Sequence, residues 1–202
     1  MNPSTINKIE SSLGLAHDFF ENLLLEDDWS FIIKIHALIE AVCTDLLLYH
    51  FKESNLVEPI TFLDLSNQRY GKTVFLKKLE LITSEHTKMI NELGKIRNAF
   101  AHKISDLGKT FEEKLNEYDK NQVKNFHSAF PLEGAIAACL MREVHGLSSL
   151  PKLESSDCIK IIKSRNFDLK LQIWAAVFGF LIHTDEIKGF SDYRQWEKSK
   201  DL

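Results

Sequence analysis

Apolar residues recur three and four positions apart along almost the whole chain, which is the spacing of helices with one buried face. No segment alternates strictly between apolar and polar residues, as a half-buried strand does, and only four prolines interrupt the pattern. The sequence therefore predicts an all-α fold, a single-domain helical bundle of about six to seven helices. We expect one domain over residues 1–202, with its core at roughly 5–189 and a polar C-terminal tail at 190–202.

The limits of the expected helices follow from where the apolar stripe starts and stops. We expect helices at 5–25, 29–52, 73–83, 85–101, 111–129, 131–145 and 167–188. Segment 29–52 is apolar around most of its circumference, which is typical of a helix in the middle of a bundle, and Asp27 and Asp28 precede it as N-cap candidates. We expect 53–71 and 103–110 to be connections, and 148–166 to be irregular with a short helix or strand at 158–163.

Composition narrows the function classes. A net charge of −4 argues against a protein that coats nucleic acid nonspecifically, since that binding needs many clustered cations. The three cysteines, Cys43, Cys139 and Cys158, are an odd number without CxxC spacing, which argues against a disulfide framework or a zinc site. No signal peptide is visible, and the most apolar stretch, 31–49, contains the ionisable residues Lys34, His36, Glu40 and Asp45. We therefore expect a soluble cytoplasmic protein without a membrane span.

The expected helix 85–101 separates its side chains into two faces. At about 100° per residue, its apolar residues fall on one side and must face the core. They are Met89, Leu93, Ile96 and Phe100. Asn98 and His102 point almost directly away from this stripe and lie one turn apart, while Arg97 lies at its margin.

The outward face of the same helix carries Gly94, Asn98, Ala101 and His102. Two small residues on such a face favour close approach of a second helix, either from this chain or from a second copy of it. In a symmetric homodimer formed through this face, two Arg97 and two His102 side chains would line one shared cleft.

The run Arg97-Asn98-Ala99-Phe100-Ala101-His102 resembles the RNxxxH motif of the HEPN superfamily of helical domains. Segments 30–48, 75–82 and 96–102 are similar to the branch of that superfamily that contains the mannitol operon repressor. The resemblance spans roughly residues 29–114, and more loosely the final helix.

The resemblance implies a bundle that dimerises along the motif helix and, in active members, metal-independent RNA cleavage without a cofactor. His102 would be the general base or acid, Arg97 would hold the scissile phosphate, and Asn98 would orient His102 or the phosphate. Histidine and arginine suit these roles, because imidazole titrates near neutrality and guanidinium donates paired hydrogen bonds to phosphate. Lys95 and Lys103 would add phosphate-binding charge, with Lys109 nearby.

One geometric condition restricts this interpretation. Arg97 and His102 are about 140° apart on an ideal helix. Both reach one phosphate only if the helix ends near His102 or if the two residues come from different subunits. The alternative without catalysis is a polar network that caps the helix end.

A polar stripe of His36, Glu40 and Thr44 interrupts the apolar segment 29–52. Glu40 is a candidate to pair with Arg97 and orient it, with His36 beside it in a second layer around the site. The alternative is a satisfied His36–Glu40 pair that fixes helix register.

The remaining histidines lack metal-ligand spacing, so we expect surface or packing roles and no metal site. The basic group Lys160, Lys163, Arg165 and Lys170 is expected to be a solvated face rather than an RNA track. Four aromatic residues that recur at helical intervals are expected to lie in the core rather than to stack on nucleic-acid bases. They are Phe19, Phe20, Trp174 and Phe178.

Two function classes stay open. The first is a HEPN-type endoribonuclease that cleaves single-stranded or loop RNA, in a toxin–antitoxin, phage-defence or RNA-processing setting, with an antitoxin as a candidate partner. The second is a non-catalytic regulator resembling the mannitol operon repressor, which acts through protein partners and uses the same motif to hold a dimer.

Overall fold

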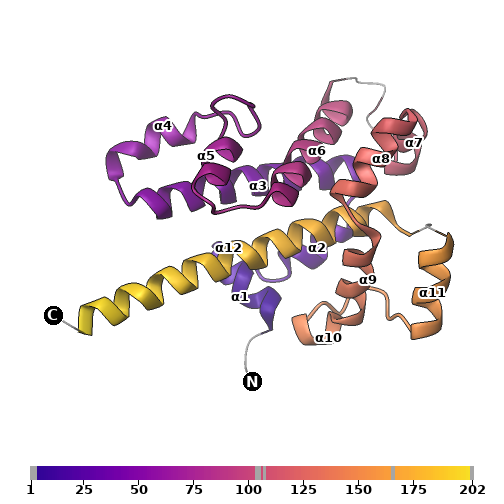
Figure 1. Cartoon of the computed structure of the whole chain (residues 1–202). Helices are drawn as coiled ribbons and strands as arrows, with labels where there is room; N and C mark the ends of the chain where they lie inside the picture. Colours follow the sequence, from indigo (N-terminus) through magenta and orange to yellow (C-terminus); the bar gives the residue numbers. More distant parts are fainter. Residues whose placement is uncertain (1–3, 103–105, 107, 165–166, 201–202) are drawn as a thin grey trace.

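The computed structural model of the chain describes residues 4–102, 106, 108–164 and 167–200, with side chains up to residue 189 (Figure 1). No β-strand occurs in this part of the chain, so the all-α prediction is confirmed. The elements are α1 (Thr5–Ser12), α2 (Phe19–Leu25), α3 (Asp28–Phe51), the 3₁₀ turn η1 (Ser54–Leu56), α4 (Val57–Thr61), α5 (Lys72–Lys78), α6 (Ser84–Ala101), α7 (Phe111–Asn116), α8 (Lys120–Ala129), α9 (Leu132–Leu140), α10 (Arg142–His145), α11 (Ser155–Ser164) and α12 (Leu169–Lys200).

The two longest helices, α3 and α12, lie side by side and organise the bundle (Figure 1). Helices α4, α5 and α6 pack on α3, whereas α1, α2 and α9 pack on α12. Both long helices bury large apolar side chains, among them Phe31, Ile39 and Leu46 of α3 and Trp174 and Phe180 of α12. None of the helices in the described ranges combines the length and apolarity needed to cross a membrane.

Polar contacts of two aspartates fix the start of α3 and connect it to neighbouring elements. The helix begins where Asp27 caps it, accepting a hydrogen bond from the Ser30 N–H at 2.9 Å, as expected from the sequence. Asp28 instead holds other elements in place: its carboxylate accepts from the Phe111 N–H at 2.8 Å and pairs with Lys170 at 2.9 Å. The helix that contacts α4, α5, α6 and α12 is therefore also tied to α7.

The expectation of one continuous helix at 5–25 is wrong, because the segment between α1 and α2 is not helical. Gly14 has φ +67° and Asp18 has φ +62°, both in the left-handed region that ends a helix. Glu10, although buried, accepts hydrogen bonds from the N–H groups of Asp18 and Phe20, each at 3.1 Å. This carboxylate therefore pairs with backbone N–H groups at the start of α2 that have no partner within the helix.

Other expected limits need correction for similar local reasons. The connection 53–71 contains η1 and α4, and the expected helix 111–129 divides into α7 and α8 because Asp119 caps the second part. The expected helix 73–83 ends at Lys78, close to Glu80 with φ +58°. The expected helix 131–145 divides into α9 and α10, and Gly146, with φ +76°, ends it as expected. The irregular segment 148–166 holds α11, and α12 continues to Lys200 rather than ending at 188.

The stability of the fold is expected to fall as pH drops from 6.5 toward 4. Burial and, secondly, the charge of His183 lower the pKa of His86 to about 4. In the fold its Nδ1 accepts a hydrogen bond from the Thr83 N–H at 3.3 Å, which requires neutral imidazole. Below pH 6.5 the unfolded chain therefore binds a proton that the fold does not, and stability is lost down to the folded pKa. The free energy of unfolding measured with urea should be lower at pH 4.5 than at pH 7, and His86, which is partly screened by solvent, should contribute about 1 kcal/mol of that difference. His86→Gln should remove that share of the difference, and an unchanged pH dependence would contradict it.

Candidate functional site

Helix α6 carries the motif and has the limits expected from the sequence to within one residue. Thr83 caps its first turn by accepting from the His86 N–H at 3.2 Å. The predicted core stripe is confirmed, since Met89, Leu93, Ile96 and Phe100 are all buried against α3 and neighbouring elements. This fixes the rotation of the helix about its axis, and with it the direction of the motif.

The face of α6 opposite its apolar stripe is only partly exposed to solvent. Asn98, Ala101 and His102 are exposed, as expected. Gly94 is buried, and a Cβ at this position would lie 3.8 Å from His36 Nε2 and 3.8 Å from Ser66 Oγ. Of the two contacts expected for Gly94, the structure shows the one within this chain, because α3 and the segment before α5 cover this position.

Arg97 lies half-buried at the margin between α6 and α3. Burial first, and then the positive charge of Arg97, lower the pKa of His36, which is 6% exposed. The guanidinium therefore lies close enough to α3 to act electrostatically on the His36 imidazole. The side chains of Arg97, Asn98 and His102 form no hydrogen bond or ion pair with any other described residue, so their polar groups have no partner in the part of the chain that the structure describes.

The end of α6 does not redirect His102. This residue is the C-cap, its backbone stays near helical values at φ −93° and ψ −8°, and its N–H donates to the Asn98 carbonyl at 3.2 Å. The angle of about 140° between Arg97 and His102 on a continuous helix therefore persists to the end of the motif. Within one chain the two side chains leave α6 in different directions.

The second-layer role expected for Glu40 is not found among the described residues. Its carboxylate pairs with Lys72 of α5 at 3.4 Å and not with Arg97. Lys72 is almost fully buried and also donates to the Thr61 carbonyl at 3.2 Å. This buried lysine joins α3, α4 and α5, and nothing in the apolar pattern of the sequence indicated it.

The expected phosphate-binding lysines differ in their surroundings. Lys95 is exposed but pairs with the buried carboxylate of Glu92 at 2.8 Å, which offsets its charge. Lys103 lies outside the described residues. The charge of Lys109 is already paired and is therefore not available to phosphate, since its ammonium group lies 2.8 Å from Asp106 and 2.6 Å from Glu117.

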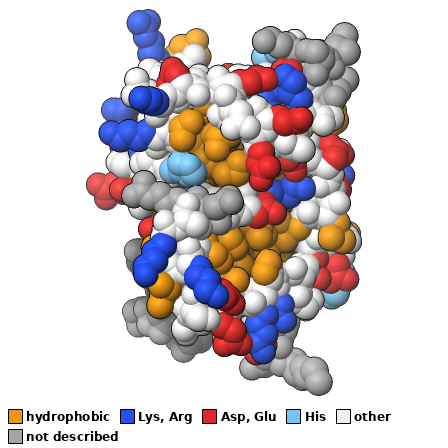
Figure 2. All heavy atoms as spheres, turned by 90° about the vertical axis from the view of Figure 1, so that its right-hand side faces the viewer, with side chains coloured by type: hydrophobic (Ala, Val, Ile, Leu, Met, Phe, Trp, Pro, Cys, Tyr) orange, Lys and Arg blue, Asp and Glu red, His pale blue; other side chains and the backbone are white. Residues whose placement is uncertain are grey.

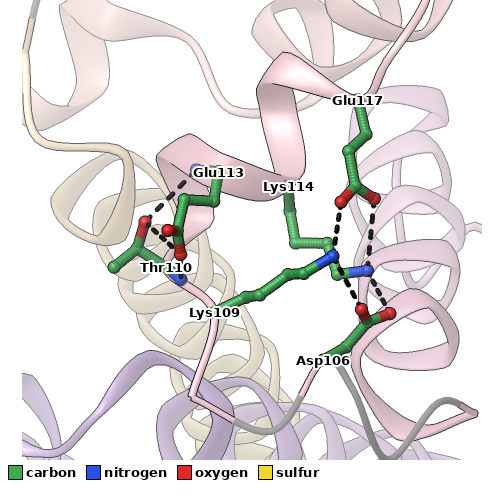
Figure 3. Close-up of polar contacts among 6 residues, drawn as sticks. All are labelled: Asp106, Lys109, Thr110, Glu113, Lys114 and Glu117. Carbon is green, nitrogen blue, oxygen red and sulfur yellow. Dashed lines mark hydrogen bonds and ion pairs between the residues drawn. The ribbon is translucent and has the colours of Figure 1, made fainter.

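A cluster of four alternating charges holds the chain that follows the motif (Figure 3). The ammonium groups of Lys109 and Lys114 lie between the carboxylates of Asp106 and Glu117, and Asp106 and Lys114 are both buried. Hydrogen bonds from Lys109 first, and then Lys114, lower the pKa of Asp106 to about 2. The stabilisation from this cluster is therefore present above the ordinary carboxyl pKa and is lost only as pH falls toward 2.

Apolar contacts add to this attachment on the opposite face of α6. The Phe100 ring lies 5.2 Å from the Phe111 ring, which lies 5.9 Å from Phe31 of α3. Lys114 also lies over the Phe100 ring at 5.9 Å. The motif thus ends on a helix whose inner face is fixed to α3 and α7, while its outer face presents Asn98 and His102.

A cavity of about 520 Å³, lined mainly by residues with polar side chains, lies beside the first half of α6, and the sequence did not predict it. Its wall includes Thr87 and Asn91 of α6, Ser66, and the lysines Lys77 and Lys78 of α5. Both lysines are exposed and form no ion pair with a carboxylate in the described part of the chain. On α6, Thr87, Asn91 and Asn98 fall within about 40° of one another, so the cavity and the motif share one helix face.

No cluster of histidine, cysteine, aspartate or glutamate suited to a metal ion occurs among the described residues. The three cysteines are free thiols, and burial raises the pKa of Cys43 to about 12. His86 and His183 pack ring to ring at 4.6 Å, which agrees with a packing role. Trp174, Phe20 and Phe178 are core residues as expected.

Comparison with known proteins adds no relative. No family model, no curated protein and no solved structure matches this chain.

Proposed function

We propose that the protein is a HEPN-type, metal-independent endoribonuclease whose cleft forms between two copies of the chain. The observation that carries the proposal is the state of the motif side chains. Arg97, Asn98 and His102 lie together at the end of one well-anchored helix, and none of the three has a hydrogen-bond partner among the described residues. Polar networks that only cap a helix use their donors and acceptors within the chain.

The directions of the Arg97 and His102 side chains support a site shared by two chains. His102 continues the helix, so the imidazole and the guanidinium of one chain diverge by about 140°. A second copy related by a twofold axis, packed on the exposed Asn98, Ala101 and His102 surface, brings Arg97 of one chain toward His102 of the other. Ala101 offers little steric resistance to this approach.

The proposed reaction needs only solvent and groups that the chain supplies. The His102 imidazole of one chain takes the proton of the ribose 2′-hydroxyl, and the 2′-oxygen attacks the adjacent phosphorus. The bond from phosphorus to the 5′-oxygen breaks, and the leaving oxygen takes a proton from solvent water. Arg97 donates hydrogen bonds to the non-bridging oxygens, where negative charge increases. The products are a 2′,3′-cyclic phosphate and a 5′-hydroxyl.

The cavity beside α6 extends this site along the same helix face. Asn91 and Asn98 are about 10 Å apart along the axis. Lys77 and Lys78 would contact backbone phosphates of a strand that leaves the cleft in this direction, and Thr87 and Asn91 would donate to its polar groups. Single-stranded RNA fits best, because a flexible strand reaches the in-line geometry that a stacked duplex resists.

Reversing the charge of the cavity lysines is expected to weaken RNA binding. Lys77→Glu with Lys78→Glu should lower the affinity for a single-stranded RNA about tenfold and reduce the slope of log K against log salt by about 1 to 2. The measurement is fluorescence anisotropy in a His102→Ala background, where RNA stays intact. Lys160→Glu with Lys163→Glu on α11 makes the same charge change elsewhere. Equal losses in both double variants would contradict a strand path beside α6.

The deciding experiment compares RNA with DNA. Purified protein is incubated in EDTA with a mixed-sequence single-stranded RNA, the same RNA carrying 2′-O-methyl groups, and the matching DNA. We expect cleavage of the unmodified RNA alone, with cyclic phosphate ends found by mass spectrometry. Cleavage of all three would overturn the proposed chemistry. A dimer that leaves every RNA intact would overturn the nuclease and favour the regulator that resembles the mannitol operon repressor.

A further inference from the structure

A second cavity lies away from the motif, between α8, α9, α11 and α12, and has a volume of about 520 Å³. None of its lining residues belongs to α6. Figure 2 shows the side of the molecule on which α8 and α11 lie, where apolar side chains gather along the middle with charged side chains around them. A volume in this range is typical of sites for small organic ligands.

The inner wall of this cavity holds an unpaired hydrogen-bond acceptor. Gln172 of α12 is 1% exposed, and its Nε2 donates to the Phe167 carbonyl at 3.0 Å. Its Oε1 is buried and accepts no hydrogen bond from any described residue. A rotation of the Gln172 side chain toward the cavity would let this oxygen accept a hydrogen bond from a ligand that supplies an N–H or O–H donor, as buried polar atoms nearly always do.

The outer wall is positively charged. Lys120, Lys124 and His127 follow one another at intervals of four and three residues, so they share one face of α8. All three are exposed, and none pairs with a carboxylate in the described ranges. Among the described residues of the wall Glu133 is the single acidic side chain, so the two lysines leave an excess of positive charge for an anionic group.

The remaining wall is apolar. Val123 of α8, Leu132 of α9 and Ile162 of α11 line it, and Ile162 is 48% exposed. A flat ring system that packs against these side chains would cover apolar surface that the chain leaves open to water. Taken together, the cavity offers an acceptor at its base, apolar side walls and cations at its mouth.

We propose that this cavity binds a nucleoside 5′-monophosphate. A nucleotide combines the three required features: a phosphate for Lys120 and Lys124, a flat base for the apolar walls, and an N–H donor on the base for Gln172 Oε1. Free phosphate lacks the second and third features, and a nucleoside lacks the first. The inference rests on this cavity alone and does not depend on the ribonuclease proposal.

The test is isothermal titration of the full chain with AMP, GMP, CMP and UMP, and with the nucleoside and inorganic phosphate as comparisons. We expect at least one nucleotide to bind with a dissociation constant below about 1 mM, and the matching nucleoside and phosphate to bind at least about tenfold more weakly. Lys120→Glu with Lys124→Glu should weaken nucleotide binding more than about tenfold. Gln172→Met, which keeps the side-chain volume and removes the acceptor, should weaken it about fivefold. Lys8→Glu with Lys52→Glu, which makes the same charge change at exposed lysines that line neither cavity, is the matched control and should bind normally.

Each contrary result has a defined meaning. No binding of any of the four nucleotides overturns the proposal, and so does binding that both cavity variants leave unchanged. Phosphate that binds as tightly as the nucleotide overturns the role of the base, and a nucleoside that does so overturns the role of the lysines. Circular dichroism melting checks that each variant is folded. If Gln172→Met does not fold, the lysine double variant, which changes only exposed side chains, still decides the question.

Discussion

Replacing His102 by alanine is expected to lower the rate of RNA cleavage by about 10²- to 10⁴-fold. The exposed imidazole has no hydrogen-bond partner within the described chain, so its removal breaks no internal contact. Thermal unfolding should therefore stay within about 1 °C of the unmodified protein, because exposed substitutions of this kind rarely change stability. The measurement is single-turnover cleavage of a labelled RNA at equal protein concentration, with melting recorded on the same samples.

His50→Ala is the matched control, because His50 is an exposed histidine in the last turn of α3 and no proposed role involves it. Its cleavage rate should equal that of the unmodified protein. If His102→Ala cleaves as fast as His50→Ala, the nuclease proposal is wrong, and any cleavage observed comes from another site or another protein.

The same variants also test whether the cleft is shared by two chains. Arg97→Ala and His102→Ala are each expected to be inactive alone. In a dimer where each cleft takes Arg97 from one chain and His102 from the other, a mixed dimer keeps one complete cleft. Refolding the two variants together in equal amounts should then restore about a quarter of the original activity. Mixed dimers that form, as shown by two affinity tags, and stay inactive would place both residues in one chain.

The sequence predicted best those features that depend on local spacing. Helix α3 and helix α6 were predicted closely, because each carries a long apolar stripe and because Asp27 was expected to cap α3. The buried side of the motif followed from the same periodicity, as Phe100 shows. Asn98 and His102 were expected on the exposed side for the same reason and lie there.

Features that depend on distant segments escaped the prediction. Gly94 has the spacing of an outward residue, but Ser66 and His36, which come from segments far away in sequence, cover it. Glu40 has the right helical position to approach Arg97, yet the buried Lys72 of α5 takes its charge. Helical spacing gives the direction of a side chain and not what lies in front of it.

The two cavities could not be predicted from the sequence, because each is formed by segments that are far apart in the chain. Gln172 lies within an apolar helix, and its unpaired oxygen becomes apparent only when every neighbouring donor has been located. Lys120, Lys124 and His127 do show helical spacing in the sequence, which is the one signal that a site faces this side of α8. Lysines on a helix are common on solvated surfaces, so this spacing gains meaning only beside a cavity.

Phe100→Ala is expected to destabilise the fold by about 3 to 5 kcal/mol, although Phe100 stands only two residues from His102. Its ring is 1% exposed, packs on Phe111 and lies beneath Lys114, so alanine leaves a cavity at the junction of α6 and α7. The melting temperature should fall by roughly 10 °C. Phe62→Ala, which removes a ring that is 81% exposed, should change it by less than about 2 °C.

The pair of variants separates the two faces of the motif helix. At a temperature where Phe100→Ala is still folded, its cleavage should fall less than that of His102→Ala, because the substitution weakens the anchoring of α6 and α7 and leaves the imidazole in place. A Phe100→Ala protein that melts within 2 °C of the original would mean that the junction with α7 does not hold this helix end. The positions of Arg97, Asn98 and His102 would then lose the rigid support on which a preorganised cleft depends.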